Sequence, residues 1–565
     1  KKRLILYIIC YKFFLEDCVF LTGSLLMDHF CGRKDILDLI RKRVVGLKEG
    51  YRQNLALIGS RHIGKSSILL KFLNDFDDNS VIPVYLDLEG RDIHYFVSKA
   101  ARALLYRYAK NRNISVEDDF ISLARRVREH IPRTVEGASA AMAFLEKGKI
   151  DEAYEAVLSL PEILVQESGL ACIIVLEEFH EIDAFGMAGA FKALADRITT
   201  QKGCLFIITS SSEESARNIL AEKLTLLFGN FEIVAVQPFD LKASHHFIEH
   251  QMAGMRMGLH LRNFLADFTG GRPLYLDLLV RELLNLGSIY KQQEIYVPLV
   301  VQAVENLVFS RWGALSRHFE LMVDHLCAVR ANRSVVDILF SLANGQHKVN
   351  EMMQSLGVNR AHVTKKLNEL VAQDIVEKNG TYFYVKDKLF RYWVKYVLQR
   401  RIKSVDMEPC CQIRAFKDEV NRAINDFLAT SRKDFPTRVT ELVRCFENEL
   451  LTLRGNLYKL PVFTDVKAVK IRSRGGNCFD ALEAQTDEGP WLLVLRKDRV
   501  AEGDINAVAE EARKMGVHSK RCVIVSLSEL EDSAKLRALE ERMWIWSEAE
   551  LNSLMNLYDK PYIVP

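Results

Sequence analysis

A glycine-rich segment that follows an apolar run constrains this chain more than any other part of its sequence. The run NLALIG begins at Asn54 and has the continuous apolar pattern of a buried parallel strand. The spacing G-x-x-x-x-G-K-S follows, and the helical pattern SSILLKFLNDF overlaps its end. Glycines let the backbone curl so that its N–H groups surround an anion, and the positive end of the helix dipole points at the same place. The sequence therefore predicts a phosphate-binding loop, made by Gly59, Ser60, Arg61, His62, Ile63, Gly64, Lys65, Ser66 and Ser67.

Two side chains of this loop and two acids elsewhere predict nucleotide chemistry. Lys65 would reach the β- and γ-phosphates, and Ser66 would hold Mg²⁺. The apolar run Ala171–Glu178 ends in two acids, of which Glu177 would support the metal and Glu178 would polarise the attacking water. Glu177 is one methylene longer than the usual aspartate, so the ion would be displaced or held more weakly. The alternative is a strand capped by solvated acids.

Apolar runs alternate with helical patterns over the first 240 residues. This alternation predicts a parallel α/β sheet wrapped by helices. Ser210, near the end of one run, stands where a polar side chain senses the γ-phosphate, and a hydroxyl at a strand-to-loop turn explains it equally well. The five predicted strands begin at Asn54 and lie within Val81–Gly90, Ala171–Glu178, Cys204–Ser212 and Phe231–Phe239.

The segments around this loop resemble the STAND branch of the AAA+ ATPases, and more narrowly the prokaryotic archaeal ATPase family. Phe30–Arg33 is similar to the motif that borders the adenine in that family, although Ile36 departs from its pattern. Gly270–Pro273 is similar to the motif that opens a helix of the lid. Over residues 28–315 the resemblance implies ATP or ADP with Mg²⁺, an ATP-driven switch with slow turnover, and a nucleotide framed by Arg33 and Pro273.

The length of 565 residues suggests about three or four domains. We expect a P-loop NTPase parallel sheet with a helical lid, then a winged-helix domain and an α/β restriction-nuclease-like domain. The predicted boundaries are 1–22 for an N-terminal extension, 23–240 for the ATPase core, 241–315 for the lid, 316–405 for the winged helix and 406–565 for the last domain.

The start of the chain has an unusual composition. Three basic residues precede the apolar run Leu4–Cys10, as in a secretory signal, but Lys12 interrupts the pattern before the about 20 apolar residues of a membrane span are reached. We interpret residues 1–22 as a non-native extension, with a buried element and a membrane anchor as alternatives. Eleven scattered cysteines without a C-x-x-C pair favour a cytoplasmic protein.

Residues 334–386 have the pattern of a winged helix. Three helical segments precede a ribbon around Asn379-Gly380, which is a strong hairpin signal. From Arg333 to Lys403 there are 13 Lys and Arg against 6 Asp and Glu, and phosphates favour such a basic patch. The third helix would present a DNA-binding surface in the major groove, or the module would pack within the molecule and report the nucleotide state. The predicted DNA contacts are Arg360, Lys365 and Lys366.

The last region weakly resembles the PD-(D/E)XK nuclease-like domain that ends many members of the same family. Glu447 would lie on its first helix. The segment Phe479–Ala484 would be its acidic strand, with Asp480 at the metal position, and Trp491–Arg499 would be the next strand. The resemblance implies a sheet with metal-binding carboxylates at one end.

One acid of that nuclease pattern is missing. A working site needs an acid two residues before its lysine, but Leu495 stands two residues before Lys497. Removing one carboxylate from a site for a hard ion weakens Mg²⁺ binding. We therefore expect a degenerate nuclease fold. The alternatives are an active site in which Glu483 replaces the missing acid, and an unrelated α/β domain.

These patterns together favour a cytoplasmic ATP-binding and slowly hydrolysing switch that repositions a winged helix and a C-terminal domain, in contact with DNA, a protein partner or a second copy of itself, and without a membrane. The alternative is a DNA-binding or scaffold protein whose nucleotide is structural and never hydrolysed. An ATP-regulated nuclease is the weaker alternative. A uniformly basic nucleic-acid coat is excluded, because 77 Lys and Arg nearly balance 74 Asp and Glu.

Overall fold

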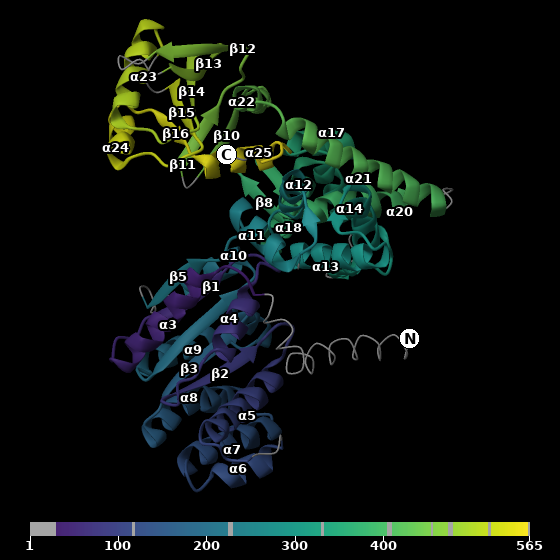
Figure 1. Ribbon diagram of the computed structural model, residues 1–565. Coiled ribbons are helices and arrows are strands. Elements are labelled where there is room, and N and C mark those ends of the chain that lie inside the picture. The colour runs from purple at the N-terminus through teal and green to yellow at the C-terminus, as the bar shows by residue number, and fades with distance from the viewer. Residues whose placement is uncertain are drawn as a thin grey trace. The chain divides into compact units, whose positions relative to one another are not determined.

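The computed structural model describes residues 30–115, 119–223, 230–252, 254–328, 333–403, 409–453, 456–472, 478–517 and 521–562 (Figure 1). The predicted extension over residues 1–22 lies outside these residues. The chain separates into two compact units. Unit 1 runs to Gln251 and includes Arg272–Leu274, and unit 2 comprises Met252–Gly271 and the chain from Tyr275 onward.

A five-stranded parallel sheet forms the centre of unit 1, in the order β2-β3-β4-β1-β5. Each strand lies within an apolar run that predicted it. All the strands are parallel, so the carboxyl ends of β1 and β3 face the same edge of the sheet, with only β4 between these strands. The strands are β1 (Asn54–Ile58), β2 (Val81–Asp87), β3 (Ala171–Glu177), β4 (Cys204–Ser210) and β5 (Phe231–Ala235).

Helices cover both faces of this sheet, because alternate residues of each strand point to opposite faces. Leu55 and Leu57 pack in one core with α3 (Lys34–Lys48) and α4 (Lys65–Asn74). Ala56 and Ile58 pack in a second core with the helices of the other face. The sheet order, the helices on both faces and the glycine-rich loop after β1 are the fold of a P-loop NTPase. The second core includes α5 (Ile93–Asn111), α6 (Phe120–Val127), α7 (Pro132–Glu146), α8 (Ile150–Ser168) and α9 (Ala190–Thr200).

The first part of unit 2 is helical, as the sequence predicts. One feature was missed, which is a short parallel pair of β6 (Arg256–Met257) and β7 (Glu294–Ile295). No helix within the described ranges is long and apolar enough to cross a membrane. Unit 1 ends with α11 (Leu241–Gln251), and the helices that follow along the chain are α12 (Leu259–Thr269), α13 (Pro273–Ile289), α14 (Val297–Val304) and α15 (Ala314–Ala328).

The three helices and the hairpin predicted over residues 334–386 are present. Asn359 caps the third helix, because its side chain accepts a hydrogen bond from the backbone N–H of His362. The elements are α16 (Arg333–Ala343), α17 (Val349–Leu356), α18 (Arg360–Ala372), β8 (Val376–Asn379) and β9 (Tyr382–Val385), and α19 (Lys388–Trp393) and α20 (Gln399–Lys403) follow them.

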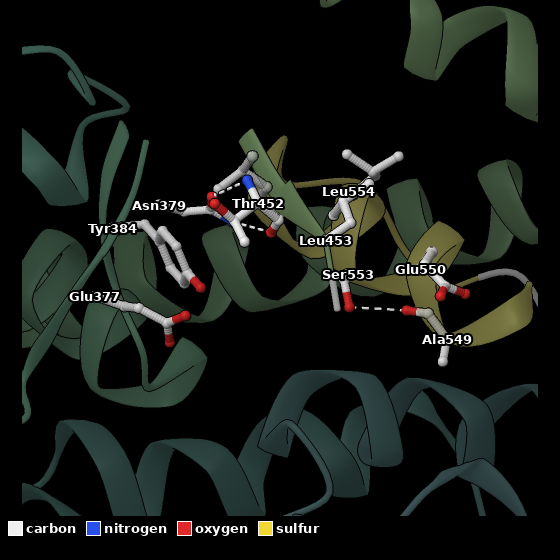
Figure 2. Close-up of a pocket in the computed structure, with 10 residues that line it drawn as sticks. Glu377, Asn379, Tyr384, Thr452, Leu453, Ala549, Glu550, Ser553 and Leu554 are labelled. Atoms are coloured by element: carbon white, nitrogen blue, oxygen red, sulfur yellow. Dashed lines mark hydrogen bonds between the residues drawn. The ribbon is translucent and has the colours of Figure 1, made fainter. Parts of the chain in front are cut away.

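The turn of the β8–β9 hairpin docks on β10 (Glu449–Leu453), as Figure 2 shows beside a cavity of about 160 Å³. The amide of Asn379 donates to the carbonyl of Thr452 at 3.0 Å and accepts from its N–H at 2.6 Å. Gly380 has a φ of 62°, and a Cβ atom there would overlap the carbonyl oxygen of Leu450. The turn therefore requires glycine both for its conformation and for this close approach.

A second five-stranded sheet forms the C-terminal α/β part of unit 2, with its strands in sequence order. The predicted strands Phe479–Ala484 and Trp491–Arg499 lie wholly or mostly within β13 and β14, whereas β10, β11, β12 and β16 were missed. The strands are β12 (Asp465–Arg472), β13 (Cys478–Thr486), β14 (Gly489–Arg496), β15 (Cys522–Ser526) and β16 (Trp544–Trp546), next to a separate pair of β10 and β11 (Asn456–Leu460). The helices are α21 (Pro409–Ser431), α22 (Phe435–Val443), α23 (Glu502–Lys514), α24 (Asp532–Glu540) and α25 (Glu548–Leu557).

Candidate functional site

The loop between β1 and α4 is built by backbone conformations that few residues adopt. His62 and Gly64 have φ values of 63° and 98°, both in the left-handed region. A Cβ atom at Gly59 would overlap the carbonyl oxygen of Val236 on the neighbouring chain segment. These constraints curl the loop around the amino end of α4, which begins at Lys65. A helix amino end carries free N–H groups and partial positive charge, so it suits a phosphate.

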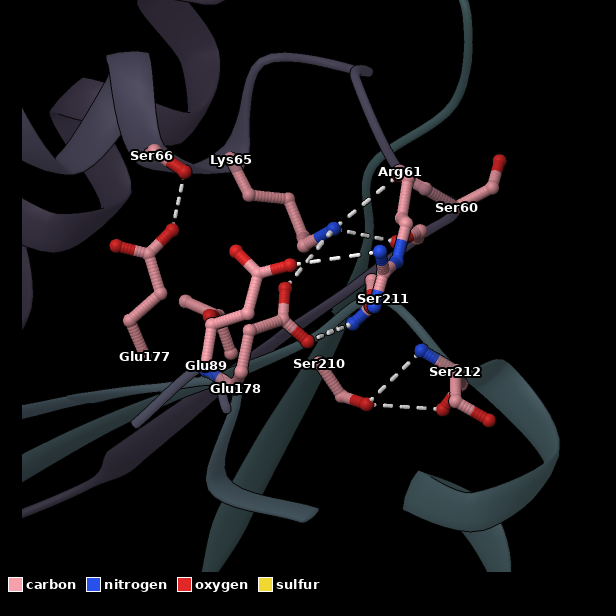
Figure 3. A network of polar contacts seen from close by, with 12 residues as sticks. Ser60, Arg61, Lys65, Ser66, Glu89, Glu177, Glu178, Ser210, Ser211 and Ser212 are labelled. Carbon is pink, nitrogen blue, oxygen red and sulfur yellow. Dashed lines mark hydrogen bonds and ion pairs between the residues drawn. The ribbon is translucent and has the colours of Figure 1, made fainter. Parts of the chain in front are cut away.

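Lys65 places a buried ammonium group inside this loop (Figure 3). Its Nζ donates to the carbonyl oxygens of Gly59 and Ser60, at 2.6 and 3.1 Å. The same atom lies 3.9 Å from Oε1 of Glu178. The predicted lysine and the predicted catalytic acid, which are more than 100 residues apart in the sequence, are therefore neighbours in the fold.

Glu177 is held by two hydroxyl groups at the end of β3. Ser66 donates to its Oε1, and Tyr85 on β2 donates to its Oε2. The carboxylate is only 5% exposed, and this burial raises its pKa to about 7, although both hydroxyl donors act in the opposite direction. The sequence reasoning missed Tyr85. Its only signal was a phenol inside the otherwise apolar run VIPVYL.

Glu178 follows β3 in a left-handed backbone conformation, with a φ of 53°. Such a conformation costs a non-glycine residue about 1–2 kcal/mol, and strained residues of this kind gather at functional sites. Its carboxylate accepts a hydrogen bond from the backbone N–H of Ser211 at 2.7 Å, and its own N–H donates to Thr209 Oγ1 at 3.1 Å. Nδ1 of His180 lies 3.4 Å from the same carboxylate. The contacts of Thr209, Ser211 and His180 fix Glu178, and sequence reasoning found none of them.

Ser210 is fully buried at the end of β4. Its hydroxyl donates to the carbonyl of Ser212 at 2.9 Å and lies 3.0 Å from Nδ1 of His180. The N–H of Ser212 donates back to the hydroxyl at 3.1 Å. These bonds form the strand-to-loop turn that the sequence analysis gave as one of two explanations. The role of Ser210 as a γ-phosphate sensor stays a prediction.

Arg33 and Arg272 come from two other segments of unit 1. Arg33 has a φ of 58°, donates to the carbonyl of Gln237 and lies 5.0 Å from the ring of Phe239. Arg272 donates to the carbonyl of Arg61 at 2.7 Å, a contact that the sequence did not reveal. Of the remaining predicted residues, Pro273 lies 4.0 Å from a Cβ built at Gly64, the side chains of Arg61 and Ser67 are exposed, and that of Ile63 is buried in the core, so Ile63 offers only its backbone to a ligand.

The side chains around Ser66 suit Mg²⁺, which prefers oxygen ligands. Because Ser66 donates its hydrogen to Glu177, the lone pairs of its hydroxyl oxygen stay available to a cation. Ser66 would hold the ion, and Glu177 would orient Ser66 and water around it. Bound Mg²⁺ would neutralise the charge that develops on phosphate oxygens.

Replacing Glu177 by Gln is expected to raise the thermal midpoint of the protein at pH 8 in EDTA. The pKa of Glu177 rises from 4.5 to about 7 on burial, so folding disfavours the ionised carboxylate. This destabilisation begins near pH 4.5, the pKa of Glu177 in the unfolded chain, and grows until the pH passes about 7, its pKa in the folded protein. Above that pH it stays constant at about 3 kcal/mol. The gain from Glu177→Gln should therefore shrink toward pH 5. An equal gain at every pH would contradict this explanation.

The exposed face of α18 is an open, nearly flat surface. Arg360 and Lys365 lie on it together with Thr364, Asn368 and Glu369, and their contact with DNA stays a prediction. Lys366 corrects the prediction, because it is buried and bonded to Glu369 at 2.7 Å. Successive helical residues differ by about 100° around the axis, which places Lys366 on the inner side.

The nuclease-like acids of the last domain are not gathered into a metal site. Glu447 was predicted on a helix but follows the end of α22 at Val443. The side chains of Asp480 and Lys497 are exposed. Across the described part of the chain, no group of three or more His, Cys, Asp or Glu residues is placed to hold a metal ion. The migrated acid Glu483 belongs to no such group either.

Several solved structures resemble this chain at low identity. The Walker-type ATPase PABY2304 of Pyrococcus abyssi has a TM-score of 0.46 and 15% identity, over 65% of this chain and 96% of that one. The ORC2 protein of Aeropyrum pernix, in ADPNP–ADP complexes, has a TM-score of 0.41 and 10% identity, over 70% of this chain and 95% of that one. The RuvB Holliday junction branch migration motor of Thermotoga maritima has a TM-score of 0.34 and 10% identity, over 65% of this chain and 96% of that one. No family model and no curated protein matches the sequence. At these scores, the fold assignment rests on the sheet order and the glycine-rich loop.

Proposed function

We propose that unit 1 binds ATP or ADP with Mg²⁺ and hydrolyses ATP slowly, as a switch whose nucleotide state repositions unit 2. One observation carries this proposal. Lys65, Ser66, Glu177 and Glu178 converge where β1 and β3 end, at the edge where parallel α/β sheets bind their ligands. Phosphoryl transfer to water needs groups that bind the phosphates and Mg²⁺, which are here the ammonium and the hydroxyl. It also needs a carboxylate that supports the metal and a group that positions the water, which are here the two glutamates.

Each of these residues has a role in the proposed reaction. The ammonium of Lys65 would lie against the β- and γ-phosphates and balance their charge. Glu178 would orient the attacking water and accept its proton while the backbone N–H of Ser211 keeps the carboxylate in place. Arg33 and Pro273 would border the nucleotide. Slow turnover agrees with the family that the sequence resembles.

The direct test is the nucleotide content and ATP turnover of the purified protein, with and without duplex DNA. Bound nucleotide together with slow turnover would support the switch. Tightly retained nucleotide without turnover would favour the alternative, a scaffold with a structural nucleotide. Neither binding at millimolar ATP nor turnover would contradict the proposal.

A second candidate function is DNA binding through α18, as a winged-helix module. The observation that favours it is the solvent-facing surface of α18, on which Arg360 and Lys365 lie together with one acid, Glu369. The β8–β9 hairpin is not free to contact DNA in this structure, because Asn379 and Gly380 pack on β10. DNA contact would then depend on α18 alone.

Replacing both Arg360 and Lys365 by Gln is expected to weaken duplex binding and to make it less salt-dependent. Each lost phosphate contact lowers the magnitude of the slope of log affinity against log salt by about 1. The slope of the double variant should therefore be smaller in magnitude by about 2. Fluorescence anisotropy at several salt concentrations measures this slope. Lys366→Met is the matched control, since the buried Lys366 faces Glu369. An unchanged slope in the double variant would exclude this surface.

A further inference from the structure

We propose that Tyr85 is a positioning residue for Glu177, which allows a glutamate to replace the shorter aspartate at the metal-supporting position. The proposal rests on the proposed nucleotide site and deepens it. Tyr85 lies on β2, beside the strand that carries Glu177, and the register pairs Asp87 with Glu177. Tyr85 lies two residues before Asp87 and therefore on the same face of β2, and its phenol reaches the carboxylate of Glu177.

The geometry around Glu177 shows why a second donor matters. Ser66 donates to Oε1 and Tyr85 donates to Oε2, so the carboxylate is held at both oxygens from two different elements. A glutamate has one more rotatable bond than an aspartate and so more rotamers to choose from. With the Tyr85 hydroxyl in place, a turn of the carboxylate away from Ser66 also breaks the bond to Tyr85, and Glu177 itself is only 5% exposed, so water replaces that bond poorly.

This arrangement has a consequence for the metal. When the carboxylate is fixed against Ser66, the hydrogen of the Ser66 hydroxyl stays in the bond to Glu177. The lone pairs of the Ser66 oxygen then point away from Glu177 and can bind a cation. Tyr85 would thus act on the cation through Glu177 and Ser66, without contacting it. Losing an outer partner of this kind typically weakens metal binding by about 10–100-fold.

Tyr85→Phe tests the proposal, because it removes only the hydroxyl. The probe is Mn²⁺, whose free concentration is followed by electron paramagnetic resonance during titration of the full chain with ADP present. We expect the half-saturating Mn²⁺ concentration to rise by about 10-fold. The affinity for a fluorescent ADP in EDTA should stay within about twofold of wild type, since the hydroxyl that is removed donates to Glu177. Tyr154→Phe is the matched control, because this buried phenol donates to Ala190 at 3.2 Å in the same unit.

A double-mutant cycle with Glu177→Asp separates positioning from a general structural role. The aspartate is shorter by one C–C bond, about 1.5 Å, so it cannot keep both the Ser66 and the Tyr85 bonds. In that background, Tyr85→Phe should change Mn²⁺ binding by less than about twofold. An equal loss in both backgrounds would overturn the proposal, and so would unchanged Mn²⁺ binding in the single variant. If the wild type binds ADP neither in EDTA nor in the presence of Mn²⁺, the proposed function itself fails.

Discussion

Glu178→Gln is expected to slow ATP hydrolysis by at least about 100-fold and to leave ATP affinity within about threefold of wild type. A positioned general base contributes about 10²–10⁴-fold, and an amide cannot accept the proton. The substitution keeps the shape of the side chain and an oxygen that can still accept from the N–H of Ser211, 2.7 Å away in the wild type. Single-turnover hydrolysis and equilibrium binding of ATP measure the two effects separately.

Glu181→Gln is the matched control for this measurement. Glu181 lies three residues further along the chain, and its Oε1 is 3.8 Å from His180, so it belongs to the same turn. Its side chain is more exposed than that of Glu178, at 25% against 11%. The control should hydrolyse ATP at close to the wild-type rate. If both variants lost activity equally, the turn would matter as a structure and Glu178 would not be the base.

The parts of the site that lie close together in sequence could be predicted, and so could the main sheet. The central strands β1, β3 and β4 are buried almost throughout, so they appear as continuous apolar runs, and each observed strand of the sheet lies within its predicted run. The loop residues and the two acids were predicted from local spacing, which a sequence shows directly, and their roles stay predictions. Lys65 and Glu178 were therefore identified before their 3.9 Å approach was known.

The parts that depend on register or on helical phase could not be predicted. Tyr85 reaches Glu177 only because β2 and β3 are neighbours in one register, which no single apolar run specifies. Lys366 was predicted to contact DNA beside Lys365, but successive residues of a helix differ by about 100° around its axis, and Lys366 is buried. The missed strand Asp465–Arg472 alternates apolar and charged residues on either side of the apolar pair Ala468-Val469, and this pair interrupts the period-2 signal.

Lys65→Met is expected to weaken ATP binding by about 100-fold or more. Charge-assisted hydrogen bonds contribute about 1.5–3 kcal/mol each, and two lost phosphate contacts at the lower limit amount to about 3 kcal/mol, which is about two factors of ten in affinity. Methionine keeps most of the apolar stem of the buried lysine, so the packing of α4 is preserved. Equilibrium binding of a fluorescent ATP analogue measures the loss.

The lysine also stabilises the loop itself, and a second variant distinguishes this role from ligand binding. Nζ of Lys65 bonds the carbonyls of Gly59 and Ser60, so its loss removes two loop contacts besides those to phosphate. Lys71→Met, on the same helix, removes only an ion pair of 3.0 Å with Asp75 and should leave affinity unchanged. Lys65→Arg keeps the charge but not the compact ammonium, and it should still lose most of the affinity, because a planar guanidinium does not fit between two carbonyls of a tight loop. Wild-type affinity in Lys65→Met would show that the nucleotide binds elsewhere in the chain.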